Sequence, residues 1–61
     1  MTKQTAFKKS LELNNKGIYT QVFWDREKTT AKKYWCISWI DTLGIERKTA
    51  QSNIVTAFLN Q

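Results

Sequence analysis

Bulky and small side chains alternate most regularly between residues 33 and 41. Trp35, Ile37 and Trp39 fall on one face of an extended chain there, and Tyr34 and Ile40 fall on the other. Aromatic and β-branched side chains fit a pleated surface better than a helix, because their χ1 angles are restricted. The alternation predicts the central strand of a small sheet, with the sequence Lys33-Tyr34-Trp35-Cys36-Ile37-Ser38-Trp39-Ile40-Asp41.

A second strand is predicted over residues 18–25, which alternate in the same way. Its faces would be Ile18, Thr20, Val22 and Trp24 on one side and Tyr19, Gln21 and Phe23 on the other. The charged stretch of residues 26–32 follows, and we expect it to form the loop to the central strand.

A third strand is predicted after a tight turn at residues 41–44. Asp41 early in this stretch and Gly44 late in it are typical of such a turn. Residues 45–50 then alternate again, with Ile45, Arg47 and Thr49 on one face and Glu46, Lys48 and Ala50 on the other.

The end of the chain has the spacing of an amphipathic helix. Ser52 is the expected N-cap, with Asn53 as a substitute. The apolar stripe that follows consists of Ile54, Val55, Phe58 and Leu59. A helix this short is not stable alone, so it must dock on the sheet. The expected partner is the face with Val22, Trp24, Trp35, Ile37, Trp39 and Ile45.

These elements predict an α+β fold: a small antiparallel three-stranded sheet, with a fourth strand left open, and a C-terminal helix packed on one face. Residues 1–61 would form a single small domain, with the sheet and helix in residues 17–60. A chain this short buries little surface. Its three Trp, three Phe and two Tyr are therefore needed largely as core, which a homodimer would enlarge.

The N-terminal arm, residues 1–13, fits two structures. Phe7 and Leu11 are four residues apart, as on one face of a helix, but Leu13 continues an alternation that suits a strand. The stretch before Gly17 is either a helix end with Gly17 at C′ or a hairpin loop. A strand from about Ser10 is favoured, because Ser-Leu-Glu-Leu runs straight into the turn.

The charge of the chain is positive and unevenly distributed. Ten Lys and Arg against five Asp and Glu give a net charge of +5, and the excess lies in the first 36 residues. A basic protein favours polyanionic partners such as nucleic acid, an anionic membrane surface or an acidic protein. Extra lysines that only keep a small protein soluble are the simpler explanation.

Residues for catalysis or metal binding are scarce. The chain has no His and one Cys, so His-based acid–base chemistry and a zinc cage are excluded, and neither an enzyme nor a cofactor is expected. Cys36 is expected to be a packed side chain, and the carboxylates Asp25, Glu27, Asp41 and Glu46 to be solvated. The absence of a disulfide, a signal peptide and a membrane span indicates a cytoplasmic protein.

The sheet face away from the C-terminal helix is half aromatic and half polar. It would present Tyr19, Gln21, Phe23, Tyr34, Cys36, Ser38, Ile40, Glu46 and Lys48, with Arg26, Lys28, Lys32 and Lys33 at one rim. Either the N-terminal arm covers this face through Phe7 and Leu11, or copies of the chain associate through it. The other interpretation is a free binding surface.

The chain also resembles a known family. Lys33-Tyr34-Trp35-Cys36-Ile37-Ser38, Asp41-Thr42-Leu43-Gly44, Arg47-Lys48 and Ala57-Phe58-Leu59 look like the three-stranded-sheet DNA-binding domain of plant ethylene-response factors and of arm-site-binding domains of phage-type tyrosine integrases. Gly17-Ile18-Tyr19 would match its opening strand. The resemblance implies that Tyr19, Gln21, Tyr34, Ser38, Ile40 and Lys48 face DNA. Lys48 is the only cation among them, which favours phosphate and stacking contacts over base reading.

Two functions follow as hypotheses. The first is a nucleic-acid-binding protein, with DNA favoured over RNA, in which the cations Arg26, Lys28, Lys32, Lys33 and Lys48 contact phosphates while Tyr19, Gln21, Phe23 and Tyr34 contact bases. The second is a phage- or plasmid-type inhibitor that docks on an acidic host protein through the aromatic face or a sheet edge. A self-associating structural piece is the third alternative.

Overall fold

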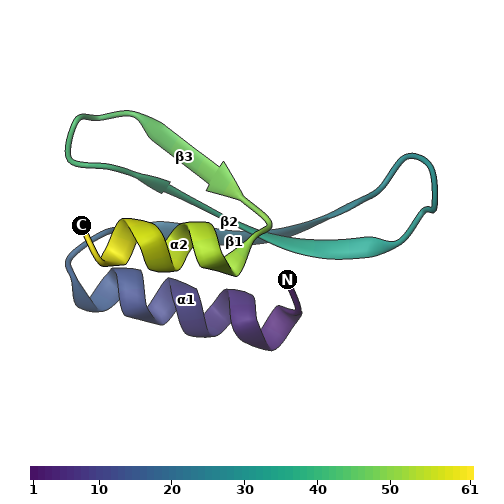
Figure 1. The fold of residues 1–61 in the computed structure, drawn as a ribbon, viewed down its shortest axis with the longest axis horizontal. Helices are drawn as coiled ribbons and strands as arrows, with labels where there is room; N and C mark the ends of the chain where they lie inside the picture. Colours follow the sequence, from purple (N-terminus) through teal and green to yellow (C-terminus); the bar gives the residue numbers. More distant parts are fainter.

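The structure, a computed structural model that describes residues 1–61, has two helices and three strands (Figure 1). They are α1 (Lys3–Asn15), β1 (Thr20–Arg26), β2 (Lys33–Ile40), β3 (Glu46–Thr49) and α2 (Ser52–Leu59). The strands form one antiparallel sheet in the order β1-β2-β3. The predicted α+β fold, with the central strand and the C-terminal helix, is confirmed.

Both helices lie on the same side of the sheet (Figure 1). The core between the two layers consists of Ala6 and Leu13 from α1, Ile37 and Trp39 from β2, and Val55 from α2. The suggestion that the N-terminal arm covers the second face was therefore wrong. The arm packs beside α2 instead, and the opposite face of the sheet has no helix over it.

The favoured strand from Ser10 was also wrong, because α1 continues to Asn15. The helix buries Ala6, Ser10 and Leu13, which are four and three residues apart and so share one face. Its start is capped by Thr2, whose hydroxyl accepts a hydrogen bond from the Thr5 backbone N–H at 3.2 Å. Small buried side chains let the helix approach the sheet closely, and they leave the larger Phe7 outside the core.

The end of α1 is a Schellman motif centred on Gly17. The Gly17 N–H donates to the Asn14 carbonyl at 2.9 Å, and the Ile18 N–H donates to the Leu13 carbonyl at 3.1 Å. Gly17 has φ +81°, a left-handed conformation that glycine adopts without strain. Leu13 and Ile18 both pack in the core. Of the two structures proposed for this stretch, the helix end is the correct one.

The C-terminal helix differs in detail from the prediction. Gln51 occupies the N-cap position without a side-chain hydrogen bond, and Ser52 is already helical. Val55 is fully buried, and the Phe58 ring lies 5.2 Å from the Trp39 ring between centroids. Ile54, predicted to join the stripe, is half exposed.

The hairpin of β1 and β2 extends beyond both helices (Figure 1). The eight residues of β2 span about 27 Å as a strand, whereas the eight residues of α2 span only about 12 Å as a helix. Residues 24–35 are called the hairpin overhang below. Its tip, residues 27–32, is closed by the Glu27 carboxylate, which accepts hydrogen bonds from the hydroxyls of Thr29 and Thr30.

The turn between β2 and β3 is organised by Asp41. Its carboxylate accepts hydrogen bonds from the backbone N–H groups of Leu43 at 2.9 Å and Ile45 at 3.0 Å, and from Arg47 Nε at 2.8 Å. Asp41 is buried, so its predicted solvation was wrong. The hydrogen bond from Ile45, followed by those from Arg47 and Leu43, lowers the pKa of Asp41 against the opposing effect of desolvation.

Candidate nucleic-acid interface

The sheet face opposite the helices gathers the side chains that the sequence placed there. Cross-strand partners include Gln21 with Ser38, Phe23 with Cys36, and Ser38 with Lys48. Since partners in register point to the same side, these residues share one surface. It is called the open face below and consists of Tyr19, Gln21, Phe23, Asp25, Tyr34, Cys36, Ser38, Ile40, Glu46 and Lys48.

The open face has a closed centre and a more exposed margin. Cys36 is only 4% exposed although no helix covers it, so neighbouring side chains must shield it. One of them is Phe23, and the ammonium of Lys48 lies 5.1 Å from the centre of its ring. Phe23 and Tyr34 are partly exposed, whereas Tyr19 is 77% exposed. The face therefore offers ring surface beside a single lysine.

Tyr34 and Cys36, two residues apart in β2 on the open face, both have raised pKa values. Desolvation, and then the nearby Asp25 carboxylate, raise the pKa of Tyr34. Burial raises the pKa of the Cys36 thiol more than Lys48 lowers it. Both groups are neutral at pH 7, so the phenol can exchange hydrogen bonds with a ligand without repelling an anion.

A shallow groove of about 290 Å³ lies at one end of the open face. Tyr19, Gln21, Ser38, Ile40 and Glu46 contribute to its lining. The Glu46 carboxylate makes this end unfavourable for phosphate. Anion contacts are expected nearer the hairpin overhang, where the cations are.

Four predicted cations do not lie on the open face itself. Arg26 and Lys33 are cross-strand partners one position beyond the pair of Asp25 with Tyr34, so they belong to the helix side of the sheet. Lys28 and Lys32 lie in the exposed tip of the overhang. Cations therefore surround the end of the hairpin rather than forming a rim on one face.

Arg26 and Lys33 meet two tryptophans on the helix side of the overhang. The Lys33 ammonium lies 4.6 Å from the centre of the Trp24 ring and 5.2 Å from that of Trp35. The Arg26 guanidinium lies 5.7 Å from Trp24. From α1, Lys3 lies 5.7 Å from Trp35, and Phe7 lies 6.2 Å from it between ring centres. These six residues are called the tryptophan cluster below.

The sequence reasoning missed this cluster because it assigned Trp24 and Ile45 to the core. Trp24 is 47% exposed, and Ile45 is also about half exposed. One signal was available: Trp24 and Arg26 are two residues apart, as are Lys33 and Trp35. Each pair must share a face of its strand.

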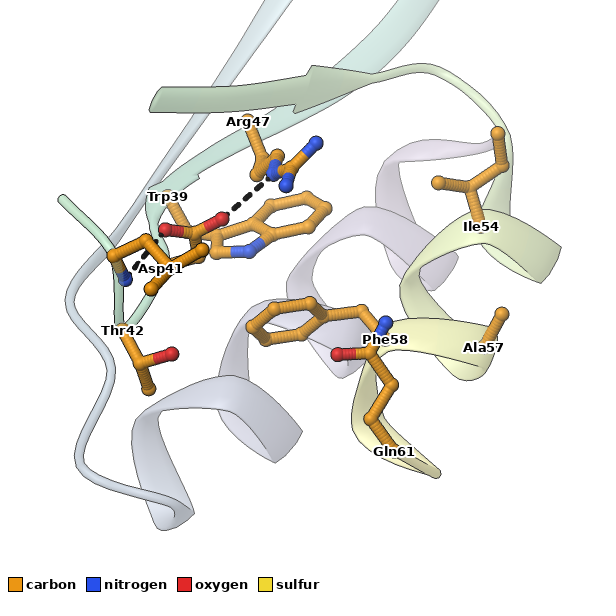
Figure 2. Close-up of a pocket in the computed structure, with 9 residues that line it drawn as sticks. Trp39, Asp41, Thr42, Arg47, Ile54, Ala57, Phe58 and Gln61 are labelled. Atoms are coloured by element: carbon orange, nitrogen blue, oxygen red, sulfur yellow. Dashed lines mark hydrogen bonds and ion pairs between the residues drawn. The ribbon is translucent and has the colours of Figure 1, made fainter. Parts of the chain in front are cut away.

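A second hollow, of about 300 Å³, lies between α2 and the turn after β2, at the end of the molecule away from the hairpin overhang (Figure 2). Trp39 and Phe58 form its apolar wall, and the ion pair of Asp41 with Arg47 lies at its edge. Leu43 also lines it and is 78% exposed. Five of the nine lining residues are hydrophobic, so the hollow combines apolar surface with the ion pair and differs from the cationic overhang.

No group of three or more His, Cys, Asp or Glu side chains comes together to hold a metal ion. Neither helix has the length and apolar character needed to cross a membrane. No family model, curated protein or solved structure matches the chain. The resemblance to the three-stranded-sheet DNA-binding domains therefore stays a prediction.

Proposed function

We propose that the protein binds nucleic acid through the end of the molecule formed by the hairpin overhang and the adjoining part of the open face. The observation that carries the proposal is that exposed cations and accessible aromatic rings occur together at this end. Lys28 and Lys32 are exposed at the tip, and the partly exposed Tyr34 follows Lys32 by two residues, near the start of β2 on the open face. Lysines neutralise phosphates, and ring faces accept bases in stacking.

The distribution of charge favours contacts that do not depend on the base sequence of the nucleic acid. Base reading in a duplex groove needs side chains with hydrogen-bonding groups that reach base edges. The open face offers Gln21 and Lys48 for this purpose, and its carboxylates Asp25 and Glu46 would repel the phosphates that flank a groove. Phosphate neutralisation at the hairpin tip with stacking by Phe23 and Tyr34 suits the surface better, whereas Tyr19 lies at the other end of the open face, beside Glu46.

Fluorescence anisotropy with labelled oligonucleotides tests the proposal. We expect single-stranded DNA, duplex DNA or RNA to bind at micromolar protein in about 50 mM salt, and the affinity to fall steeply toward about 200 mM. The double variant Lys28→Glu, Lys32→Glu should weaken binding and flatten the salt dependence. Lys16→Glu is the control for a charge reversal elsewhere, because Lys16 follows the C-terminal end of α1, which lies away from the hairpin overhang (Figure 1). Absence of binding to all three nucleic acids would contradict the proposal.

A protein partner is the second candidate, and the exposed apolar residues around the second hollow favour it. Leu43 is 78% exposed and Ile45 and Ile54 are just under half exposed, and two of the three, Leu43 and Ile54, line the hollow beside Phe58. Exposed apolar clusters of this kind mark association surfaces. Affinity capture on the wild-type protein should then retain a partner in stoichiometric amount that Leu43→Asp does not retain. Sedimentation of both proteins distinguishes a foreign partner from a second copy of the chain.

A further inference from the structure

The tryptophan cluster pairs aromatic and cationic side chains in consecutive rungs of the hairpin ladder. Trp24 lies opposite Trp35, and on the same face the next rung holds Arg26 opposite Lys33. Rungs on one face are separated by about 6.8 Å along a strand. The cations are thus held beside the indole rings, at 4.6 to 5.7 Å from the ring centres.

The cluster lies at the edge of the part of the sheet that α1 covers. Trp35 is partly buried against Phe7 of α1, but Trp24 is 47% exposed and Phe7 is 52% exposed. A chain of 61 residues needs its large aromatic side chains to stabilise a small core. Placing two of them half in water leaves much of their hydrophobic contribution unused, which calls for another role.

A purely structural role for the cluster would be shielding. The stems of Lys33 and Arg26 cover indole surface, and cation–π attraction at an exposed site contributes about 0.5–1 kcal/mol. That role predicts a cluster that stays unchanged when nucleic acid is added. In that role the cluster also has no affinity for an aromatic ring of a ligand.

We propose that the tryptophan cluster is a stacking site for an unpaired base of single-stranded nucleic acid, and that Lys3, Arg26 and Lys33 hold the phosphates on either side of that base. The inference rests on the proposed function and names its substrate class. In a duplex the faces of the bases are covered by their neighbours, whereas a single strand offers every base face to an aromatic ring. Flexible cationic side chains can move from the indole rings to the phosphates as the base enters.

The site is built from two parts of the chain. β1 and β2 supply both tryptophans with Arg26 and Lys33, and the first turns of α1 supply Lys3 and Phe7. It lies on the opposite side of the hairpin from Tyr34 and the rest of the open face. A strand bound at the cluster is therefore separable by mutation from one bound on the open face.

The experiment is a titration of the full chain with a 15-nucleotide oligothymidylate, the corresponding oligouridylate and a 15-base-pair DNA duplex, followed by tryptophan emission. We expect both single strands to quench the emission and to protect it from acrylamide, because Trp24 is the most exposed tryptophan of the three. The oligothymidylate and oligouridylate arms distinguish DNA from RNA. The duplex should bind more weakly and leave the emission nearly unchanged.

Variants separate stacking from charge. Trp24→Ala should lower the affinity for the single strands about tenfold, and Trp24→Phe, which keeps a ring, should lower it roughly threefold or less. Leu43→Ala is the control, because it removes an exposed apolar side chain (78% exposed) at the turn after β2, away from the hairpin overhang. Circular dichroism should show that each variant is folded, and the acrylamide measurement on the wild-type chain needs no variant.

The outcomes assign failure clearly. If Trp24→Ala binds the single strands as tightly as the wild type while Lys28→Glu, Lys32→Glu binds weakly, the stacking site is wrong and the nucleic-acid function stands. An equal affinity for duplex and single strand without any change in emission also overturns the stacking site. If no oligonucleotide binds at all, the proposed function itself is wrong.

Discussion

The carboxylate of Asp41 and the guanidinium of Arg47 lie 2.8 Å apart across the turn that joins β2 to β3. Arg47 donates from Nε, and the carboxylate also accepts the backbone N–H groups of Leu43 and Ile45. One buried acidic group thereby fixes the turn, the start of β3 and the edge of the second hollow. Its ionised form is the one that these donors stabilise.

Replacing Asp41 should make the free energy of unfolding less dependent on pH in the acid range. The pKa of Asp41 is lowered in the folded chain, so its contribution is present above the unfolded value of about 3.9 and is lost as the pH falls through the lower folded value. Asp41→Asn should therefore be less stable than the wild type at pH 7, and the difference should shrink toward pH 3. Urea unfolding at several pH values measures it. Glu46→Gln, on the exposed side of the turn, should change stability far less, and a constant difference for Asp41→Asn at all pH values would contradict the account.

Ile37→Ala should cost about 2–5 kcal/mol of unfolding free energy. Ile37 is fully buried at the centre of β2 and joins the side chains of both helices in one core. Ile40→Ala removes the same atoms from the exposed end of the strand and should cost less than about 1 kcal/mol. Chemical denaturation with an unchanged slope provides the comparison. Equal losses in the two variants would show that the core lies elsewhere.

Gly17→Ala should cost about 1 kcal/mol or more, because an L-residue with a side chain is strained in the left-handed conformation that ends α1. No atom lies within 4 Å of the position that the added Cβ would take, so the cost is conformational and not a steric clash. Gly17→Asn should lose less, since Asn tolerates this conformation better. Thermal unfolding of both variants measures these costs. An Ala variant as stable as the wild type would show that residue 17 does not need the left-handed conformation.

Alkylation of Cys36 should be slow in the folded protein and fast after unfolding in urea. The thiol is buried, and desolvation raises its pKa, so little reactive thiolate forms at pH 8. Lys48 opposes this shift, and Lys48→Met should therefore raise the pKa of Cys36 further and slow labelling again. Mass spectrometry of iodoacetamide-treated samples across a pH series gives the rates. Rapid labelling of the folded wild type would show that the centre of the open face is accessible.

The alternation between residues 33 and 40 predicted the fold well, because Trp35, Ile37 and Trp39 can share a face only in a strand. The tight turn at Asp41 and Gly44 was equally direct. The N-terminal arm was ambiguous for a physical reason. Phe7 and Leu11 satisfy helix and strand spacing alike, and the choice depends on the close packing of Ala6 and Ser10 against the sheet, which no local pattern reveals.

Alternation alone assigned Phe23 and Lys48 to one face of the sheet, and both lie on the open face. Alternation does not give the length of the helical layer that covers the other face. Alternation placed Trp24 on the helix side, but it did not show that α2 does not extend over that position. Arg26 and Lys33 follow the same alternation, two residues from Trp24 and Trp35, so the sequence already indicated that they lie on the helix side.

The tip at residues 27–32 projects past both helices (Figure 1), so its side chains do not take part in the hydrophobic core. Substitutions or insertions there would alter the proposed binding end without a compensating change in Ala6, Leu13 or Val55. Grafting of another hairpin tip at residues 27–32 should therefore change the proposed binding end while the core of helices and sheet stays the same.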